Sequence, residues 1–194
     1  MLQYISKNRK GYQAAEEAAR VIEGGCRWIE IDMPEESDEY VKKSAMEMID
    51  ACREHDAFLI IRDHIDVVDD LKVSGIHISD PKEISKTRER LGANAVVGVS
   101  VQNPEEVIIL KGKDADYVTV KDKSPLEMKE FVENVRKSGM KDIAVVAEGN
   151  ITLDNLEEYI NSGVNGIAIS SAIADSDDPM LYTSQIMEKL LNIK

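Results

Sequence analysis

The stretch VVAEGNITLDNLEEYINSGVNGIAISSAI, from Val145 to Ile173, contains two strand-like runs joined by a helix-like segment. The runs VVAEG and GIAIS are short and apolar, whereas TLDNLEEYI between them has the spacing of a helix. Two parallel strands need a crossover connection of this kind. The stretch therefore predicts a βαβ unit, with Gly149-Asn150 and Ser170-Ser171 at the carboxyl ends of its two strands.

The same alternation continues along the rest of the chain. The predicted strands are Leu2–Ser6, Arg27–Asp32, Ala57–Asp63, Gly75–Ser79, Ala95–Ser100, Asp116–Val120, Ile143–Gly149 and Gly166–Ser170. Helical patterns lie between them, and three helices begin with Asp, Asn or Ser followed by Pro, which is a typical helix start. About eight strand–helix units in 194 residues favour an α/β fold, a single (β/α)8 TIM barrel that spans residues 1–194. An open doubly wound sheet remains the alternative, because alternation does not prove closure.

The composition restricts the partners and the location of the protein. The formal net charge is −13, which argues against a nucleic-acid backbone or an anionic membrane as a partner. Neither Cys26 nor Cys52 belongs to a CxxC pair, no apolar stretch has the length of a membrane span, and the N-terminus lacks the order of a secretory signal. We therefore expect a reduced, cytoplasmic protein.

The two turns of the opening stretch predict a phosphate site. Phosphate groups in such barrels often bind the loops after the last two strands and the start of a following short helix. Gly149 and Asn150 follow one strand, and Ser170 and Ser171 follow the other, so backbone N–H and hydroxyl groups would act as donors. The alternative is that Gly149 only forms a turn and that Ser170 only caps a helix.

Two aspartates after neighbouring strands form a candidate metal site. Asp63 and Asp80 could share a hard cation such as Mg²⁺, which uses few carboxylates together with water and phosphate oxygens. Helix capping is the alternative for both residues, and the Asp80-Pro81 pair favours it there. His77 lies within a strand, where a lone histidine is more often a packed, hydrogen-bonded residue than a ligand.

Six segments resemble a known family in their order and spacing. They are FLIIRDHIDV, SGIHISD, AVVGVSVQNPEEV, ADYVTV, VVAEGNI and GVNGIAISSAI. The chain resembles the thiamine phosphate synthase and thiazole tautomerase superfamily over nearly its whole length. That resemblance implies a (β/α)8 barrel whose synthases join a pyrimidine diphosphate to a thiazole phosphate and release pyrophosphate with Mg²⁺. It also implies a small phosphorylated substrate and is compatible with a homodimer.

The resemblance assigns roles to matching positions. Asp63 matches the family's metal-binding aspartate, and Asp80 stands near the second one, where the register slips. Ser100 matches the serine after the fifth strand. Gly149 matches the first glycine of the thiazole-phosphate turn, and Ser170-Ser171 match the other half of that phosphate site.

The chain departs from the family where the diphosphate binds. The family has Gln, Arg and Lys after the second strand, whereas this chain has Glu30, Asp32 and Pro34. Carboxylates at these positions would repel a diphosphate, by about 1 kcal/mol or more for each close charge.

Three basic residues are candidates to replace the missing cations. Arg62 stands where the family has Asn, and the shortened loop VKDKS retains Lys121 and Lys123. Asn150 replaces the second glycine of the phosphate turn. No histidine follows DYVTV, where the tautomerase branch carries one.

The leading hypothesis is a synthase-like barrel that binds a small phosphorylated ligand. Asp63, Arg62, Ser100, Lys121 and Lys123 would be its catalytic residues, with Mg²⁺ as cofactor. One alternative is a non-catalytic or regulatory relative that binds a phosphorylated ligand. The other is a barrel isomerase or lyase, in which acidic strand-end residues perform acid–base chemistry on a small phosphate. The acidic residues concerned are Glu30, Asp32 and Glu148.

Overall fold

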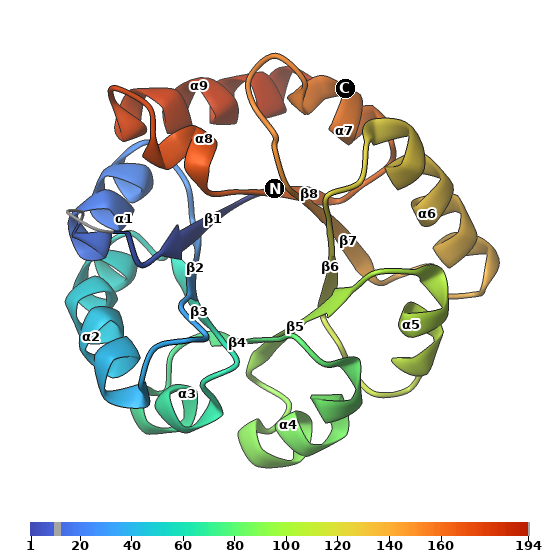
Figure 1. The fold of residues 1–194 in the computed structure, drawn as a ribbon, viewed down its shortest axis with the longest axis horizontal. Coiled ribbons are helices and arrows are strands. Elements are labelled where there is room, and N and C mark those ends of the chain that lie inside the picture. Colours follow the sequence, from blue (N-terminus) through green and yellow to red (C-terminus); the bar gives the residue numbers. More distant parts are fainter. Residues whose placement is uncertain (10–12, 194) are drawn as a thin grey trace.

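The strands form a closed parallel barrel, which confirms the predicted (β/α)8 fold (Figure 1). The computed structural model describes residues 1–9 and 13–193. Each strand pairs with the next along the chain, and β8 pairs with β1, so the open-sheet alternative is wrong. The strands are β1 (Leu2–Lys7), β2 (Trp28–Asp32), β3 (Phe58–Arg62), β4 (Gly75–Ile78), β5 (Val96–Val101), β6 (Tyr117–Lys121), β7 (Ala144–Glu148) and β8 (Gly166–Ile169).

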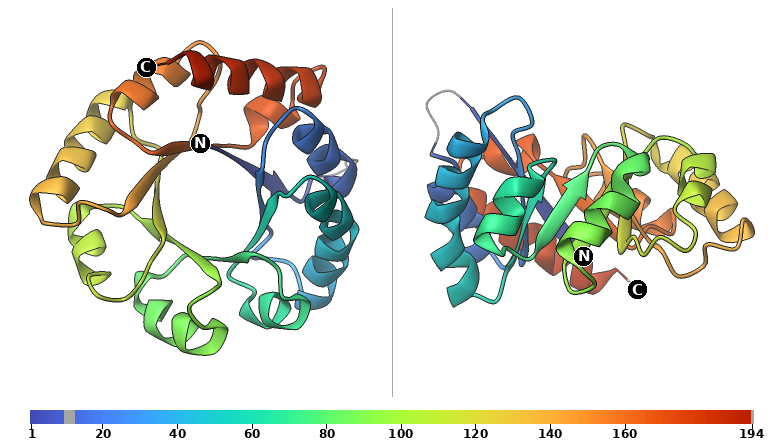
Figure 2. Two further views of the ribbon diagram at one scale, coloured as in Figure 1. Left: turned by 180° about the vertical axis from the view of Figure 1, so that it is seen from behind. Right: turned by 90° about the horizontal axis from the view of Figure 1, so that it is seen from below.

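Helices surround the barrel on its outer side, as views from both ends show (Figures 1 and 2). They are α1 (Ala14–Glu23), α2 (Asp38–Glu54), α3 (Ile65–Leu71), the 3-10 helix η1 (Pro81–Glu83), α4 (Ile84–Leu91), α5 (Pro104–Ile109), α6 (Pro125–Lys137), α7 (Leu156–Asn161), α8 (Ser171–Ala174) and α9 (Pro179–Asn192). The predicted starts carry the expected caps: Asp80, Asn103 and Ser124 each accept a backbone N–H of the first turn. In residues 1–9 and 13–193, the helices are too short or too polar to cross a bilayer.

The main hydrophobic core lies between the strands and the helices. Outward-facing side chains such as Ile29, Ile61 and Val118 are fully buried there against the helices. Both cysteines are free thiols that are buried in this layer. A much smaller apolar cluster occupies the barrel interior and includes Ile5 and Val146.

The rest of the barrel interior is polar, because the strand register places polar side chains at alternate, inward-facing positions. Arg62 pairs with His77 across β3 and β4, and Ser100 pairs with Thr119 across β5 and β6. Paired residues of a sheet point to the same face, so these side chains converge inside the barrel. Gly98 leaves space for the neighbouring ring of Tyr117, because a Cβ at Gly98 would lie 2.1 Å from that ring.

Candidate functional site

The turns after β7 and β8 line one pocket, which we call the cradle pocket. Its volume is about 200 Å³. Its lining residues are Ile5, Lys7, Lys121, Asp122, Glu148, Gly149, Asn150, Ala168, Ser170 and Ser171. The structure therefore brings together the four residues predicted to bind phosphate, at the carboxyl end of the barrel.

The local conformation of both turns leaves donors at this pocket. Gly149 has φ 152°, a backbone conformation that side-chain-bearing residues rarely adopt, and a Cβ there would lie 3.4 Å from Oδ1 of Asp122. Ser170 occupies the N-cap position of α8, yet its side chain makes no capping hydrogen bond. The Ser170 hydroxyl is thus available to a ligand, beside the first N–H groups of a short helix.

Two lysines contribute positive charge to the cradle pocket. The Nζ of Lys7 lies 3.4 Å from Asp32, and the Nζ of Lys121 lies 3.8 Å from Glu148. Their side chains are 39% and 58% exposed, so both can reach a ligand. Sequence reasoning missed Lys7, although the period-two alternation with Gln3 and Ile5 places it on the inner face.

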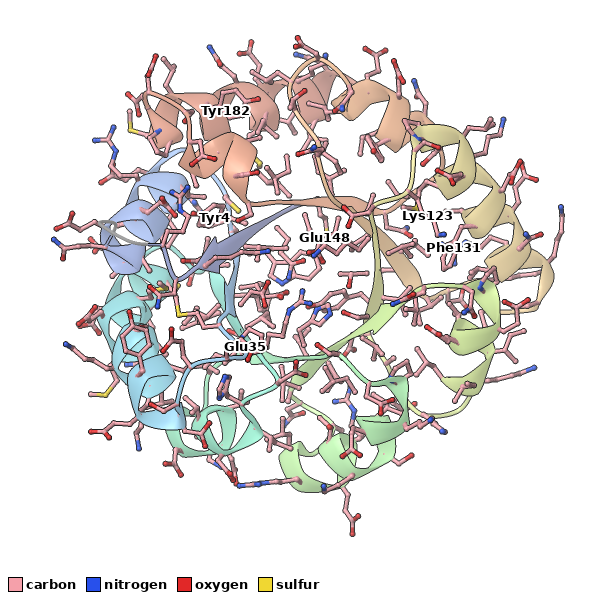
Figure 3. All side chains as sticks on the ribbon, viewed as in Figure 1. Tyr4, Glu35, Lys123, Phe131, Glu148 and Tyr182 are labelled. Atoms are coloured by element: carbon pink, nitrogen blue, oxygen red, sulfur yellow. The ribbon has the colours of Figure 1, made fainter. Side chains whose placement is uncertain are left out.

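Lys123 is not brought to this pocket. It contributes no lining atoms there, and its backbone carbonyl accepts a hydrogen bond of 3.0 Å from the Tyr159 hydroxyl. Figure 3 shows Glu148 toward the barrel axis and Lys123 farther out, on the side of α6. Lys121, rather than Lys123, is therefore the lysine of this loop that faces the site.

Arg62 lies inside the barrel and is held by three carboxylates. Its guanidinium lies 2.7 Å from Glu30, 3.2 Å from Asp32 and 3.4 Å from Glu148. Burial disfavours the charged guanidinium, but these carboxylates outweigh burial and raise the pKa of Arg62. Arg62 is a sequence candidate for binding a diphosphate, but its positive charge is thus already neutralised within the protein.

Glu30 is the deepest acid of this cluster. Its side chain is fully buried, accepts a hydrogen bond of 2.8 Å from Gln3 and lies 3.3 Å from Nδ1 of His77. Burial would raise the pKa of Glu30, but the charges and hydrogen bonds of His77 and Arg62 lower it to about 2. Glu30 is therefore a permanent anion and a poor proton donor near neutral pH.

Ser100 connects His77 to Arg62. Its hydroxyl lies 2.9 Å from Nε2 of His77 and 3.4 Å from the guanidinium of Arg62, and Thr119 lies 3.5 Å away. His77 is fully buried and also contacts the Tyr117 hydroxyl at 3.2 Å. The expectation of a packed, hydrogen-bonded histidine is confirmed.

The candidate metal residues line a different pocket. Asp63 and Asp80 share a space of about 220 Å³ with Ile76 and Ile78, whose side chains belong to the outer core. Both oxygens of Asp63 accept hydrogen bonds from Ser79, one from its N–H and one from its hydroxyl. This pocket therefore lies on the helix side of β4, apart from the cradle pocket.

Helix capping is the alternative role for both aspartates, and only Asp80 performs it. Asp80 caps η1 by accepting the N–H of Lys82 at 2.9 Å. Asp63 does not cap α3, whose N-cap position is His64. Instead, Asp63 adopts a left-handed conformation with φ 63°, in which its side chain reaches across to the turn after β4.

Comparisons with known proteins agree with the resemblance. A family model described as thiamine monophosphate synthase matches residues 2–173. Thiamine-phosphate synthases of Bacteroides fragilis and Bacteroides thetaiotaomicron are each 32% identical to the chain, covering 96% and 100% of it and 98% and 97% of the relatives. A solved thiamine phosphate pyrophosphorylase from Pyrococcus furiosus superposes with a TM-score of 0.84 at 26% identity, covering 99% of this chain and 96% of that one.

Proposed function

Because the chain belongs to the thiamine monophosphate synthase family, we propose that it binds a small phosphate ester in the cradle pocket. One observation carries this proposal: a single pocket combines the Gly149 turn, the uncapped Ser170 hydroxyl and two partly exposed lysines. Backbone N–H groups and a helix start suit an anion, and the lysines add charge that a protein of net charge −13 otherwise lacks.

We further propose that the ester is a thiazole phosphate and that the partner substrate is a pyrimidine diphosphate. In this reaction, the bond between the pyrimidine methylene carbon and the diphosphate oxygen breaks, and its electron pair leaves with pyrophosphate. The thiazole nitrogen then forms the new bond to that carbon. Lys121 would stabilise the leaving pyrophosphate, while Ser100, held by His77, would contact substrate near Arg62. The residues act by positioning and charge, with little demand for proton transfer.

The donor set at Asp63 and Asp80 is compatible with Mg²⁺. An ionised carboxylate has about four lone-pair sites, so Asp63 keeps acceptor capacity after its two hydrogen bonds from Ser79. Among residues 1–9 and 13–193, no group of three or more His, Cys, Asp or Glu gathers to hold a metal. An ion there would take its other ligands from water and, where a diphosphate extends from the cradle pocket to this turn, from phosphate oxygens, whose negative charge it would neutralise.

A turnover assay tests the synthase proposal. Purified protein would receive the pyrimidine diphosphate, thiazole phosphate and Mg²⁺, and thiamine phosphate would be detected by mass spectrometry. We expect product in the wild type, loss of product in Asp63→Asn, and unchanged product in Asp66→Asn, an exposed aspartate paired with Arg90. Intact substrates and no product in the wild type would exclude this reaction for this substrate pair.

The carboxylates around Arg62 favour a second candidate function. Glu30, Asp32 and Glu148 surround the position where a diphosphate would otherwise find cations. In an isomerase or lyase that acts on a small phosphate, Asp32 or Glu148, rather than the permanently ionised Glu30, would perform the acid–base chemistry. Conversion of a sugar phosphate, followed by NMR and abolished in Glu148→Gln, would support it. Phosphate-ester binding without any turnover would instead support a non-catalytic relative.

A further inference from the structure

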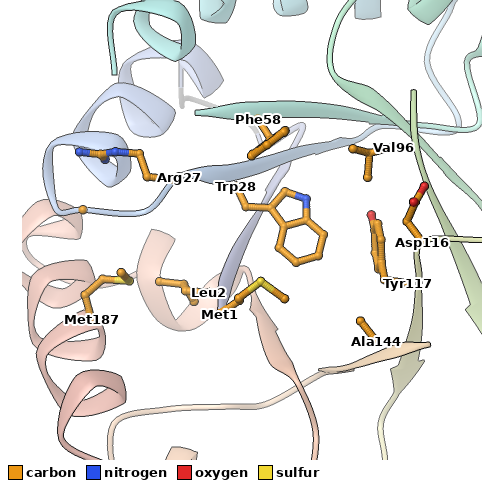
Figure 4. A pocket seen from close by; sticks show the side chains of 11 residues that line it. Met1, Leu2, Arg27, Trp28, Phe58, Val96, Asp116, Tyr117, Ala144 and Met187 are labelled. Carbon is orange, nitrogen blue, oxygen red and sulfur yellow. The ribbon is translucent and has the colours of Figure 1, made fainter. Parts of the chain in front are cut away.

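The amino-terminal mouth of the barrel contains an apolar pocket, which we call the lower pocket (Figure 4). Its volume is about 400 Å³. Residues at or near the starts of six strands contribute to its lining: Leu2, Trp28, Phe58, Val96, Tyr117 and Ala144. The catalytic end of such barrels is the opposite one, so this pocket is separate from the cradle pocket.

The lower pocket leaves aromatic surface open to solvent. Phe58 is 53% exposed and Met1 is 62% exposed, although inner positions of such barrels normally carry packed side chains. The rings of Trp28 and Tyr117 meet edge to face, with centroids 4.7 Å apart. Ala144, a small side chain, lines the same cavity (Figure 4). A concave apolar surface of this kind is typical of a binding site.

The charged residues of this mouth already have partners. Arg27 donates to the carbonyls of Ile22 and Cys26, at 2.6 Å and 2.9 Å. Asp116 accepts from Arg88 at 2.9 Å and from the N–H of Val97 at 2.7 Å. The partners of Arg27 are neutral, but an ionic ligand would lose its hydration against walls that are mainly apolar, which favours a neutral one.

One polar group in the lower pocket remains available. Within residues 1–9 and 13–193, the indole N–H of Trp28 donates to no acceptor; the contacts of this residue are its backbone bonds and the ring pair with Tyr117. Trp28 is only partly buried, so water can reach this N–H, and an acceptor on a bound ligand would take the place of that water.

We propose that the lower pocket binds a neutral, planar aromatic or heteroaromatic molecule that carries a hydrogen-bond acceptor. Its faces would pack against Trp28 and Phe58, and its acceptor would meet the Trp28 indole N–H. The cavity lies within the range of about 300–1,000 Å³ that is usual for small-molecule sites. Its concave shape and aromatic walls favour a small molecule over the flat surface of a second chain.

The test uses Trp28 as its own reporter, because it is the only tryptophan of the chain. The full chain would be titrated with quinoline, a neutral heteroaromatic acceptor, while the indole N–H cross-peak is followed by two-dimensional NMR. Benzoate, a charged aromatic, serves as the ligand control. We expect a saturable shift with quinoline and none with benzoate.

Variants localise the binding. Ala144→Leu fills the cavity and should weaken quinoline binding by about tenfold or more, as steric occlusion of a small pocket predicts. Phe58→Ala removes an exposed wall at little expected cost to folding and should also weaken binding, whereas Leu126→Ala, an exposed residue of α6, should not. The proposal is overturned if quinoline gives no saturable shift, or if the affinity is the same in all variants. Sedimentation that shows a dimer dispersed by Phe58→Asp would equally overturn it, since a second copy would then cover the mouth.

Discussion

A diphosphate site requires cations that are free to bind the ligand, and Arg62 shows most clearly that this barrel differs, because carboxylates surround its guanidinium. The sequence identified Arg62 as a cation and Glu30, Asp32 and Glu148 as strand-end acids. It did not show that all three acids bind the same guanidinium, because those contacts depend on the register of β2, β3 and β7 around the closed barrel. The partly exposed cations Lys7 and Lys121 are consequently the ones available to a ligand.

Removing the cation should destabilise the protein strongly. Arg62→Met leaves Glu30 buried without its guanidinium, and breaking a buried ion pair from one side costs about 3–5 kcal/mol. Urea unfolding measures the change. Arg90→Met is the matched control, since Arg90 also binds two aspartates but is 40% exposed, and exposed pairs contribute about 0–1 kcal/mol. An equal decrease in unfolding free energy in both variants would contradict the claim that the buried ion pairs of Arg62 stabilise the protein.

The low pKa of Glu30 makes part of the stability depend on pH. A carboxyl whose pKa is about 2 in the folded protein stabilises the fold above its unfolded pKa, and this contribution is lost as pH falls toward 2. Between about pH 5 and pH 2, the wild type should lose about 3 kcal/mol more unfolding free energy than Glu30→Gln. Urea unfolding across this window provides the measurement, and parallel curves for the two proteins would be evidence against the shifted pKa.

At the scale of elements, sequence patterns located the strands closely. The sequence predicts strands at Arg27–Asp32 and Gly75–Ser79, and the structure has them at Trp28–Asp32 and Gly75–Ile78. The alternation of apolar and polar residues and the cap residues are local signals, so they can be recognised without knowledge of the tertiary structure. The orientation of the Asp63 side chain cannot be predicted from local patterns, because it depends on a left-handed backbone at Asp63 and on Ser79 in the turn after β4.

The cap of α6 provides an element-scale test. Ser124 and Glu127 form a reciprocal capping box, in which each side chain bonds the other residue's N–H. Ser124→Ala should lower the unfolding free energy by about 1 kcal/mol, measured by urea unfolding. Lys129→Ala, an exposed change within the same helix, should have almost no effect. A Ser124→Ala protein as stable as the wild type would show that the box contributes nothing.

At the scale of the whole molecule, the alternation of strands and helices favours a closed barrel but does not prove that the barrel closes. The β1–β8 pairing joins residues more than 160 positions apart, such as Leu2 and Ile167, and no local pattern encodes it. The interior polar network follows from that closure, since it combines side chains of the seven strands β1 to β7. The homodimer and the cytoplasmic location stay predictions.

Calorimetric titration of thiazole phosphate into the wild type, Gly149→Ala and Gly92→Ala tests the central claim most directly. Gly92 also has a positive φ, of 76°, but lies away from the cradle pocket with open space around its Cβ position. We predict that the wild type and Gly92→Ala bind the ligand, and that Gly149→Ala binds it about tenfold more weakly or worse, because backbone strain of about 1–3 kcal/mol displaces the turn. Absence of binding in the wild type, or equal affinity in all three proteins, would contradict a phosphate site at the cradle pocket.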